Sequence, residues 1–142
     1  MQDAAFLGGA AFTRAYVGNI HAVAHTLGGQ YGTPHGLANA VIMPYVLEMY
    51  GDTVYQSLTE MAVAAGIADK TVSYRENAEM FIAAIRAMNA EMGIADKIPE
   101  LIANDIPTLA RRALREANPL YPVPVIFNRE KMERVYHHLV ES

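Results

Sequence analysis

The chain has 142 residues, of which 52% are hydrophobic and 18% are charged, and its formal net charge is −4. This length suits one domain with a buried core, and the composition argues against disorder, while the lack of any basic run argues against nucleic acid or an anionic membrane as a partner. There is no Cys, which excludes disulfides and thiolate metal sites, and we expect a cytoplasmic protein.

The N-terminal region, residues 4–27, is rich in Ala and apolar on most faces. This pattern predicts a central buried helix or a broken pair of helices. The first twelve residues lack the basic start of a signal peptide, and no stretch approaches the ~20 apolar residues of a membrane span. Because a chain rarely begins inside a buried helix, we expect a further segment upstream.

The next elements are marked by Gly and Pro. Gly28 and Gly29 are expected to end the first region, and Thr33 is expected to cap a new helix with Pro34 at its first position. That helix should carry residues 37–50, with a kink near Pro44, and should end at Gly51. A third helix is predicted over residues 53–65, before Gly66.

The second half of the chain shows further helical signals. Ser73 and Glu76 form a capping box for a helix that reaches about Met92, with Phe81, Ile85, Met88 and Met92 at helical spacing. Pro99 and Pro107 are expected to begin two shorter helices, the second ending near Glu116. Residues 118–127 predict a loop with three prolines, and Asn128 should cap the last helix, which reaches about residue 140. The fold class is therefore all-α, a helical bundle in a single domain over residues 1–142.

Three of the five His lie within fifteen residues, at positions 21, 25 and 35. His21 and His25 are one helical turn apart and share a face. A Gly-Gly turn allows the chain to reverse, so that His35 can approach the first helix. Neutral imidazole is a good ligand for divalent iron or zinc, so the pattern favours a cation site. The alternative is that these are ordinary polar residues lining a core or an interface.

The stretch GNIHAVAHTLGGQYGTPHG, residues 18–36, resembles the second signature of the iron-dependent alcohol dehydrogenases. Residues 11–13, 39–44 and 105–114 also resemble this family, so that the resemblance covers nearly the whole chain, although only the His stretch is specific. The signature matches at Gly18, His21, Ala24, His25, Leu27, Gly28, Gly29, Pro34, His35, Gly36 and Ala38.

The resemblance implies a fold like the C-terminal helical domain of these enzymes and of dehydroquinate-synthase-like enzymes. It implies that His21 and His35 are ligands of Fe²⁺, or of Zn²⁺, and that Phe12 lines the substrate pocket. His25 matches a residue beside the nicotinamide and the substrate, which gives it a catalytic and cofactor-binding role. We hypothesise that His25 relays the alcohol proton, since His titrates near neutrality. Replacing His25 by Ala in the complete enzyme should then alter turnover and its pH profile.

Half of the family's metal ligands are missing from this sequence. The family supplies them as an Asp followed four residues later by a His, and no such pair occurs here. Glu133 and His137 have the spacing, but they lie on a polar helix where a solvated pair is the expected reading. No glycine-rich dinucleotide motif follows a strand either. The nucleotide-binding domain, which would hold NAD or NADP, is therefore expected to lie outside this sequence.

We therefore expect the metal-binding part of an NAD(P)-dependent oxidoreductase that interconverts alcohols with aldehydes or ketones. Alone, this chain is expected to bind metal weakly and to be inactive. An apolar face left by the missing domain should favour a homo-oligomer. Two alternatives remain: a self-sufficient helical interaction module, and a small divalent-metal sensor or carrier that uses His21, His25 and His35.

Overall fold

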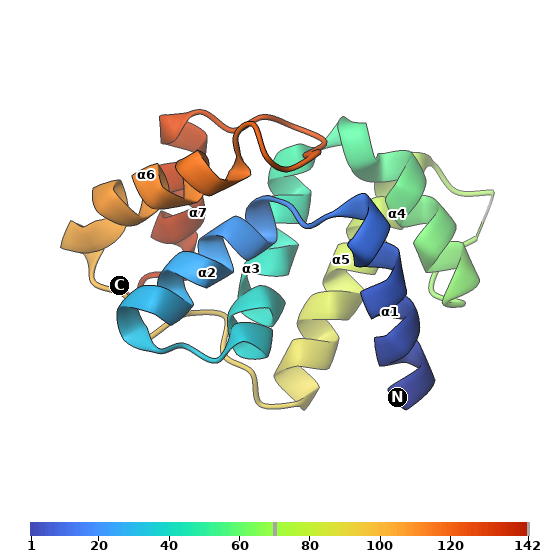
Figure 1. Cartoon of the computed structure of the whole chain (residues 1–142). Helices are drawn as coiled ribbons and strands as arrows, with labels where there is room; N and C mark the ends of the chain where they lie inside the picture. The colour runs from blue at the N-terminus through green and yellow to red at the C-terminus, as the bar shows by residue number, and fades with distance from the viewer. Residues whose placement is uncertain (70, 142) are drawn as a thin grey trace.

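A computed structural model describes residues 1–69 and 71–141 and shows only helices and connecting segments in these ranges (Figure 1). The predicted all-α class is therefore confirmed. None of the helices in these ranges is long and apolar enough to cross a membrane. The helices are α1 (Gln2–Ala15), α2 (Asn19–Tyr31), α3 (His35–Tyr50), α4 (Asp52–Ala64), α5 (Tyr74–Glu91), a short 3₁₀ helix η1 (Ala103–Asp105), α6 (Ile106–Ala117) and α7 (Arg129–Leu139).

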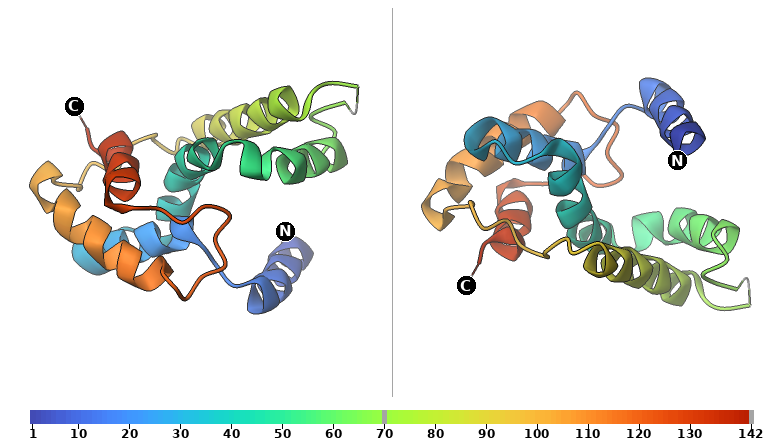
Figure 2. Two further views of the ribbon diagram at one scale, coloured as in Figure 1. Left: turned by 90° about the horizontal axis from the view of Figure 1, so that it is seen from above. Right: turned by 90° about the horizontal axis from the view of Figure 1, so that it is seen from below.

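The first region is a broken pair of helices, and only its second member is buried. The break lies between Tyr16, which has a positive φ of 60°, and Gly18, the N-cap of α2. No residue of α1 is buried, so the expected burial at the start of the chain was wrong. Both views in Figure 2 show α1 standing apart from the other helices. Its apolar side chains have no packing partner within the described ranges to bury them.

The reversal between α2 and α3 occurs later than predicted. Helix α2 runs through Gly28 and Gly29 and ends at Gly32, which has a φ of 71°. Gly is tolerated inside a helix, whereas a positive φ is costly for other residues, so Gly32 is the position that requires glycine. Pro34, not Thr33, is the N-cap of α3, and Pro44 lies inside that helix.

Helices α4 and α5 pack side by side as a hairpin, and α5 also packs against α3 (Figure 2). The predicted cap at Ser73 is confirmed, because the amide of Glu76 donates to Ser73 Oγ. The Glu76 carboxylate accepts from the Ser73 hydroxyl. The predicted apolar stripe is only partly correct, because Met88 and Met92 are more than half exposed. Asn89 points inward instead and donates to the Ala40 carbonyl, so a buried amide replaces an apolar residue.

The C-terminal region follows the prediction except at Pro99, which begins a turn and not a helix. Pro107 lies in the first turn of α6, and residues 118–127 form a loop. The Lys131 amide donates to Asn128 Oδ1 and caps α7 as expected. Helix α6 packs between α2 and α7 (Figure 1), with its small and apolar residues facing inward: Ile106, Leu109, Ala110, Ala113 and Ala117.

Side-chain contacts show that α2 and α6 run antiparallel. The Tyr31 hydroxyl donates to Asp105 Oδ2 at 2.7 Å, and Arg112 Nη1 donates to Gln30 Oε1 at 3.0 Å. These contacts join the end of α2 to Asp105, which directly precedes α6, and to the middle of α6. The opposite end of α6 therefore lies beside the middle and start of α2, where His21 and His25 are located.

Candidate metal and nicotinamide site

The structure brings the three clustered histidines together. The ring centres of His21 and His35 are 5.3 Å apart, those of His25 and His35 are also 5.3 Å apart, and those of His21 and His25 are 5.9 Å apart. The rings of His25 and His35 are stacked, with 20° between their planes. The predicted approach of His35 to the preceding helix is therefore confirmed.

Small buried residues allow α2 to pack closely against its neighbours α3 and α6. Ala22 and Ala24 of α2 and Ala38 of α3 are almost completely buried. The αL conformation of Gly32 turns the chain between them, and His35 is the first residue of α3. The cluster therefore lies at the reversal, on a rigid framework and not on a long loop.

The electrostatic environment of His21 favours its neutral form. Burial lowers the pKa of His21, and the nearby His35 and His25 lower it further, while the charge of Glu116 opposes this shift. A metal ligand must carry a free nitrogen lone pair, which only a neutral imidazole offers. The cluster therefore keeps His21 in the form that can bind a cation near neutral pH.

His35 is oriented by its own helix. Asn39 Nδ2 donates to His35 Nε2 at 3.0 Å and to the His35 carbonyl oxygen at 2.9 Å. A carbonyl only accepts, so the second contact fixes which end of the Asn39 amide faces His35. The Nε2 atom of His35 is thus an acceptor in this structure, and the ring is held by a residue one turn further along α3.

His25 has a carboxylate partner that the sequence analysis did not find. His25 Nδ1 lies 2.6 Å from Glu116 Oε1, and the Tyr121 hydroxyl donates to the same oxygen at 2.7 Å. Glu116 is the only acidic residue of α6, a helix that otherwise carries three Arg. That isolated charge was the available signal, but nothing in the sequence links residue 116 to residue 25.

The other predicted residues lie elsewhere. Phe12 is on α1, is 55% exposed, and makes no aromatic contact with the histidines among the described residues. Glu133 pairs with Arg129 at 2.7 Å, and His137 is exposed, as expected for a solvated pair. His138 stacks on Tyr45, with 5.1 Å between the ring centres.

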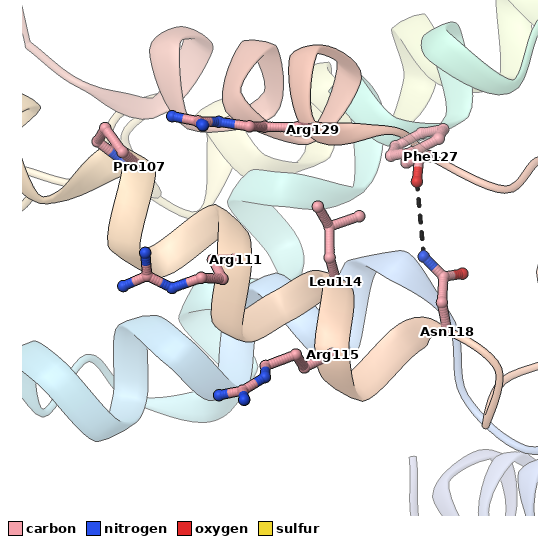
Figure 3. Close-up of a pocket in the computed structure, with 7 residues that line it drawn as sticks. All are labelled: Pro107, Arg111, Leu114, Arg115, Asn118, Phe127 and Arg129. Atoms are coloured by element: carbon pink, nitrogen blue, oxygen red, sulfur yellow. Dashed lines mark hydrogen bonds between the residues drawn. The ribbon is translucent and has the colours of Figure 1, made fainter.

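Within residues 1–69 and 71–141, no three His, Asp or Glu side chains are arranged to hold a metal ion. Three cavities of about 360 to 430 Å³ also lie away from the histidines. One of about 430 Å³ is lined by α6, the following loop and the start of α7, and includes Arg111, Arg115 and Arg129 (Figure 3). The candidate site is therefore an open cluster of imidazoles and not an enclosed pocket.

Comparison with known proteins identifies the family. The family described as "Fe-containing alcohol dehydrogenase family, C-terminal" matches residues 1–140. The chain belongs to this family.

Relatives and solved structures agree with the assignment. The chain is 36% identical over 120 residues to a 1,3-propanediol dehydrogenase of Citrobacter freundii, which covers 83% of this chain and 31% of that protein. It is 36% identical over 133 residues to alcohol dehydrogenase 4 of Saccharomyces cerevisiae, covering 91% of this chain and 33% of the relative. The crystal structure of a 1,3-propanediol oxidoreductase superposes with a TM-score of 0.85 at 32% identity, covering 92% of this chain and 35% of that one.

This member of the Fe-containing alcohol dehydrogenase family thus spans about a third of the length of these relatives. The matched part corresponds to the C-terminal, helical region of the family. The resemblance found in the sequence is confirmed for family and for fold.

Proposed function

We propose that this chain is the metal-binding part of an iron-dependent alcohol dehydrogenase, which acts together with a nucleotide-binding domain that other residues supply. The complete enzyme would interconvert alcohols with aldehydes or ketones, using NAD or NADP. The observation that carries the proposal is the 5.3 Å separation of the His21 and His35 rings, which come from two successive helices.

This separation fits a shared cation. Two imidazole rings that bind one tetrahedral metal ion have centres roughly 5 Å apart, because each metal–nitrogen bond is about 2.1 Å long. We therefore assign His21 and His35 as two ligands. The donor set suits Fe²⁺, with Zn²⁺ as the second candidate, and Asn39 would have to release Nε2 of His35 if that atom is the ligand.

Each residue has a distinct part in this proposal. When bound, the cation would act as a Lewis acid on the substrate oxygen. His25 stands beside both ligands, and we assign it to the nicotinamide and substrate side, where it would accept or return the alcohol proton. Phe12 would line the substrate pocket once α1 packs against a partner domain.

The exposed apolar side chains of α1 support the proposal of a partner domain. Phe6, Leu7 and Phe12 of α1 are each more than half exposed, as is Tyr16 at its C-cap. Exposed apolar patches of this kind typically mark interaction surfaces. We propose that the nucleotide-binding domain covers this helix, and that a second copy of the chain associates through it when the domain is absent.

A cation held by two imidazoles and no carboxylate would remain mostly bound to water. We therefore expect the 142-residue chain to bind metal weakly and to lack dehydrogenase activity. Robust NAD-dependent alcohol oxidation by the pure chain would contradict this expectation.

Calorimetric titration of the chain with Zn²⁺ tests the ligand assignment. His21→Ala and His35→Ala should each weaken binding by roughly tenfold or more, because one of two protein ligands is lost. His137→Ala, which removes an exposed histidine on α7, is the matched control and should leave binding unchanged. Equal binding by all four proteins would refute the proposal.

A second function, a small divalent-metal carrier, is favoured by the equally close approach of His25 to His35. The same Zn²⁺ titration distinguishes a metal carrier from the metal-binding part of a dehydrogenase. A carrier requires tight, one-to-one binding that His25→Ala abolishes, whereas the dehydrogenase assignment expects weak binding that His25→Ala leaves nearly unchanged.

A further inference from the structure

A hydrogen-bonded chain of three side chains ends at His25. The Tyr121 hydroxyl donates to Glu116 Oε1, and the same oxygen lies 2.6 Å from His25 Nδ1. Tyr121 belongs to the loop after α6, Glu116 to the last turn of α6, and His25 to the middle of α2. Residues from three segments therefore meet at one carboxylate oxygen.

The chemistry of the contact determines the protonation pattern of the imidazole. An ionised carboxylate has no hydrogen to give, so His25 Nδ1 must donate in this contact. A neutral imidazole has only one N–H group, which leaves Nε2 of His25 with its lone pair free. Among the described residues, Nε2 of His25 has no hydrogen-bond partner. In its neutral form, the ring therefore presents a free base on the side away from Glu116.

Tyr121 reinforces this arrangement. Burial, the hydrogen bond to Glu116 and the charge of that residue together raise the pKa of Tyr121 to about 12. The hydroxyl therefore keeps its proton over the whole physiological range and is a permanent donor to Glu116. This contact holds the carboxylate from the loop side, while His25 holds it from α2.

We propose that Glu116 is a positioning residue for His25, which fixes its Nδ1–H tautomer and its orientation so that Nε2 is the working nitrogen. Its relevance to alcohol oxidation rests on the proposed function, in which His25 handles the substrate proton. Carboxylate partners commonly set the tautomer and orientation of functional histidines.

A purely structural role is the competing explanation, since the His25–Glu116 contact also joins α2 to α6. However, the Tyr31–Asp105 and Gln30–Arg112 contacts already join the end of α2 to the residue before α6 and to the middle of α6. These contacts involve no histidine. Arg112→Ala therefore provides a matched control, because it removes a contact between the same two helices without touching the histidine cluster.

Nitrogen-15 NMR of histidine-labelled full-length chain, recorded without metal, tests the proposal directly. The wild type should show His25 protonated at Nδ1 with a bare Nε2. Glu116→Ala should shift the His25 population towards the Nε2–H tautomer, whereas Glu116→Gln should retain Nδ1–H, because its amide oxygen still accepts. Arg112→Ala should match the wild type, and circular dichroism would verify that each variant is folded.

Tyr121→Phe gives a second reading that leaves Glu116 in place. It should produce a smaller shift in the same direction as Glu116→Ala, because the carboxylate loses the contact that holds it in place from the loop side. An unchanged His25 tautomer in Glu116→Ala, or an equal change in Arg112→Ala, would overturn the proposal. If Glu116→Ala does not fold, an unchanged tautomer in Tyr121→Phe would overturn it. None of these readings depends on metal binding, so they fail or succeed separately from the proposed function.

Discussion

Helices α1 and α2 are similar in length and each contains a Gly-Gly pair, but their environments are opposite. Helix α1 has no buried residue, whereas α2 buries six of its thirteen residues. The difference lies in their partners: α3 and α6 pack against α2, while α1 has no extensive packing within the described ranges (Figure 2). Composition therefore determines that both segments are helical, and neighbouring helices determine which of them contributes to the core.

The largest expected effect on stability comes from replacing one leucine by alanine in each of the two helices. Leu27 of α2 is fully buried, and Leu7 of α1 is 65% exposed. Leu27→Ala should lower the free energy of unfolding by about 2–5 kcal/mol, because it leaves a cavity in the core. Leu7→Ala should change it by less than about 0.5 kcal/mol. Urea denaturation measures both, and similar losses would show that α1 is part of the core.

Replacing one glycine by alanine in each region compares their backbone conformations. Gly32, at the end of α2, has a φ of 71°, and an added Cβ would meet nothing within 4 Å. Gly32→Ala should therefore cost about 1–2 kcal/mol from backbone strain alone. Gly8 lies inside α1 with equally open surroundings. Gly8→Ala should favour α1 locally by about 0.5–1 kcal/mol.

The readouts for these two variants differ. Gly32→Ala should shift the global denaturation midpoint to lower urea. Gly8→Ala should increase amide-exchange protection within α1 and leave the global midpoint unchanged. A global stabilisation by Gly8→Ala would contradict the separate behaviour of α1.

A single hydrogen bond within a buried polar pair joins α2 to α7. The Tyr136 hydroxyl lies 2.6 Å from Thr26 Oγ1, which itself donates to the Val23 carbonyl. Since Thr26 uses its hydrogen there, Tyr136 is the donor. Tyr136→Phe should cost about 1 kcal/mol at neutral pH, the usual net worth of one hydrogen bond.

The same residue gives a pH signature. Burial raises the pKa of Tyr136 in the folded state above that of the unfolded chain. Above about pH 10 the folded state therefore binds more protons than the unfolded state, and stability falls as pH rises. Denaturation curves from pH 9 to 11 should show a shallower fall for Tyr136→Phe. An equal slope for both proteins would mean that Tyr136 is not buried as described.

Local signals in the sequence predicted most of the helices. The Ser73 and Asn128 caps and the glycines at 51, 66 and 93 mark real helix ends. The errors arose where tertiary packing decides the outcome. Gly28 and Gly29 tolerate a helix as well as a turn, and only the packing of α2 against α3 and α6 selects the helix.

The candidate site was predictable where its residues are close in sequence. His21 and His25 lie one turn apart, and the short reversal returns His35 to them. Glu116 was not predictable, since 91 residues separate it from His25 and their contact depends on the antiparallel packing of α2 against α6. The position of Phe12 relative to the cluster also depends on packing, because nothing in the described chain holds α1 against α2.

X-ray absorption at the zinc edge of the Zn²⁺-loaded chain tests the central claim most directly, because it counts the imidazoles bound to the metal. We predict two imidazoles and otherwise water oxygens in the wild type, two in His25→Ala, and one in His35→Ala. An unchanged count in His35→Ala, or the loss of an imidazole in His25→Ala, would contradict the assignment of His21 and His35 as the metal ligands.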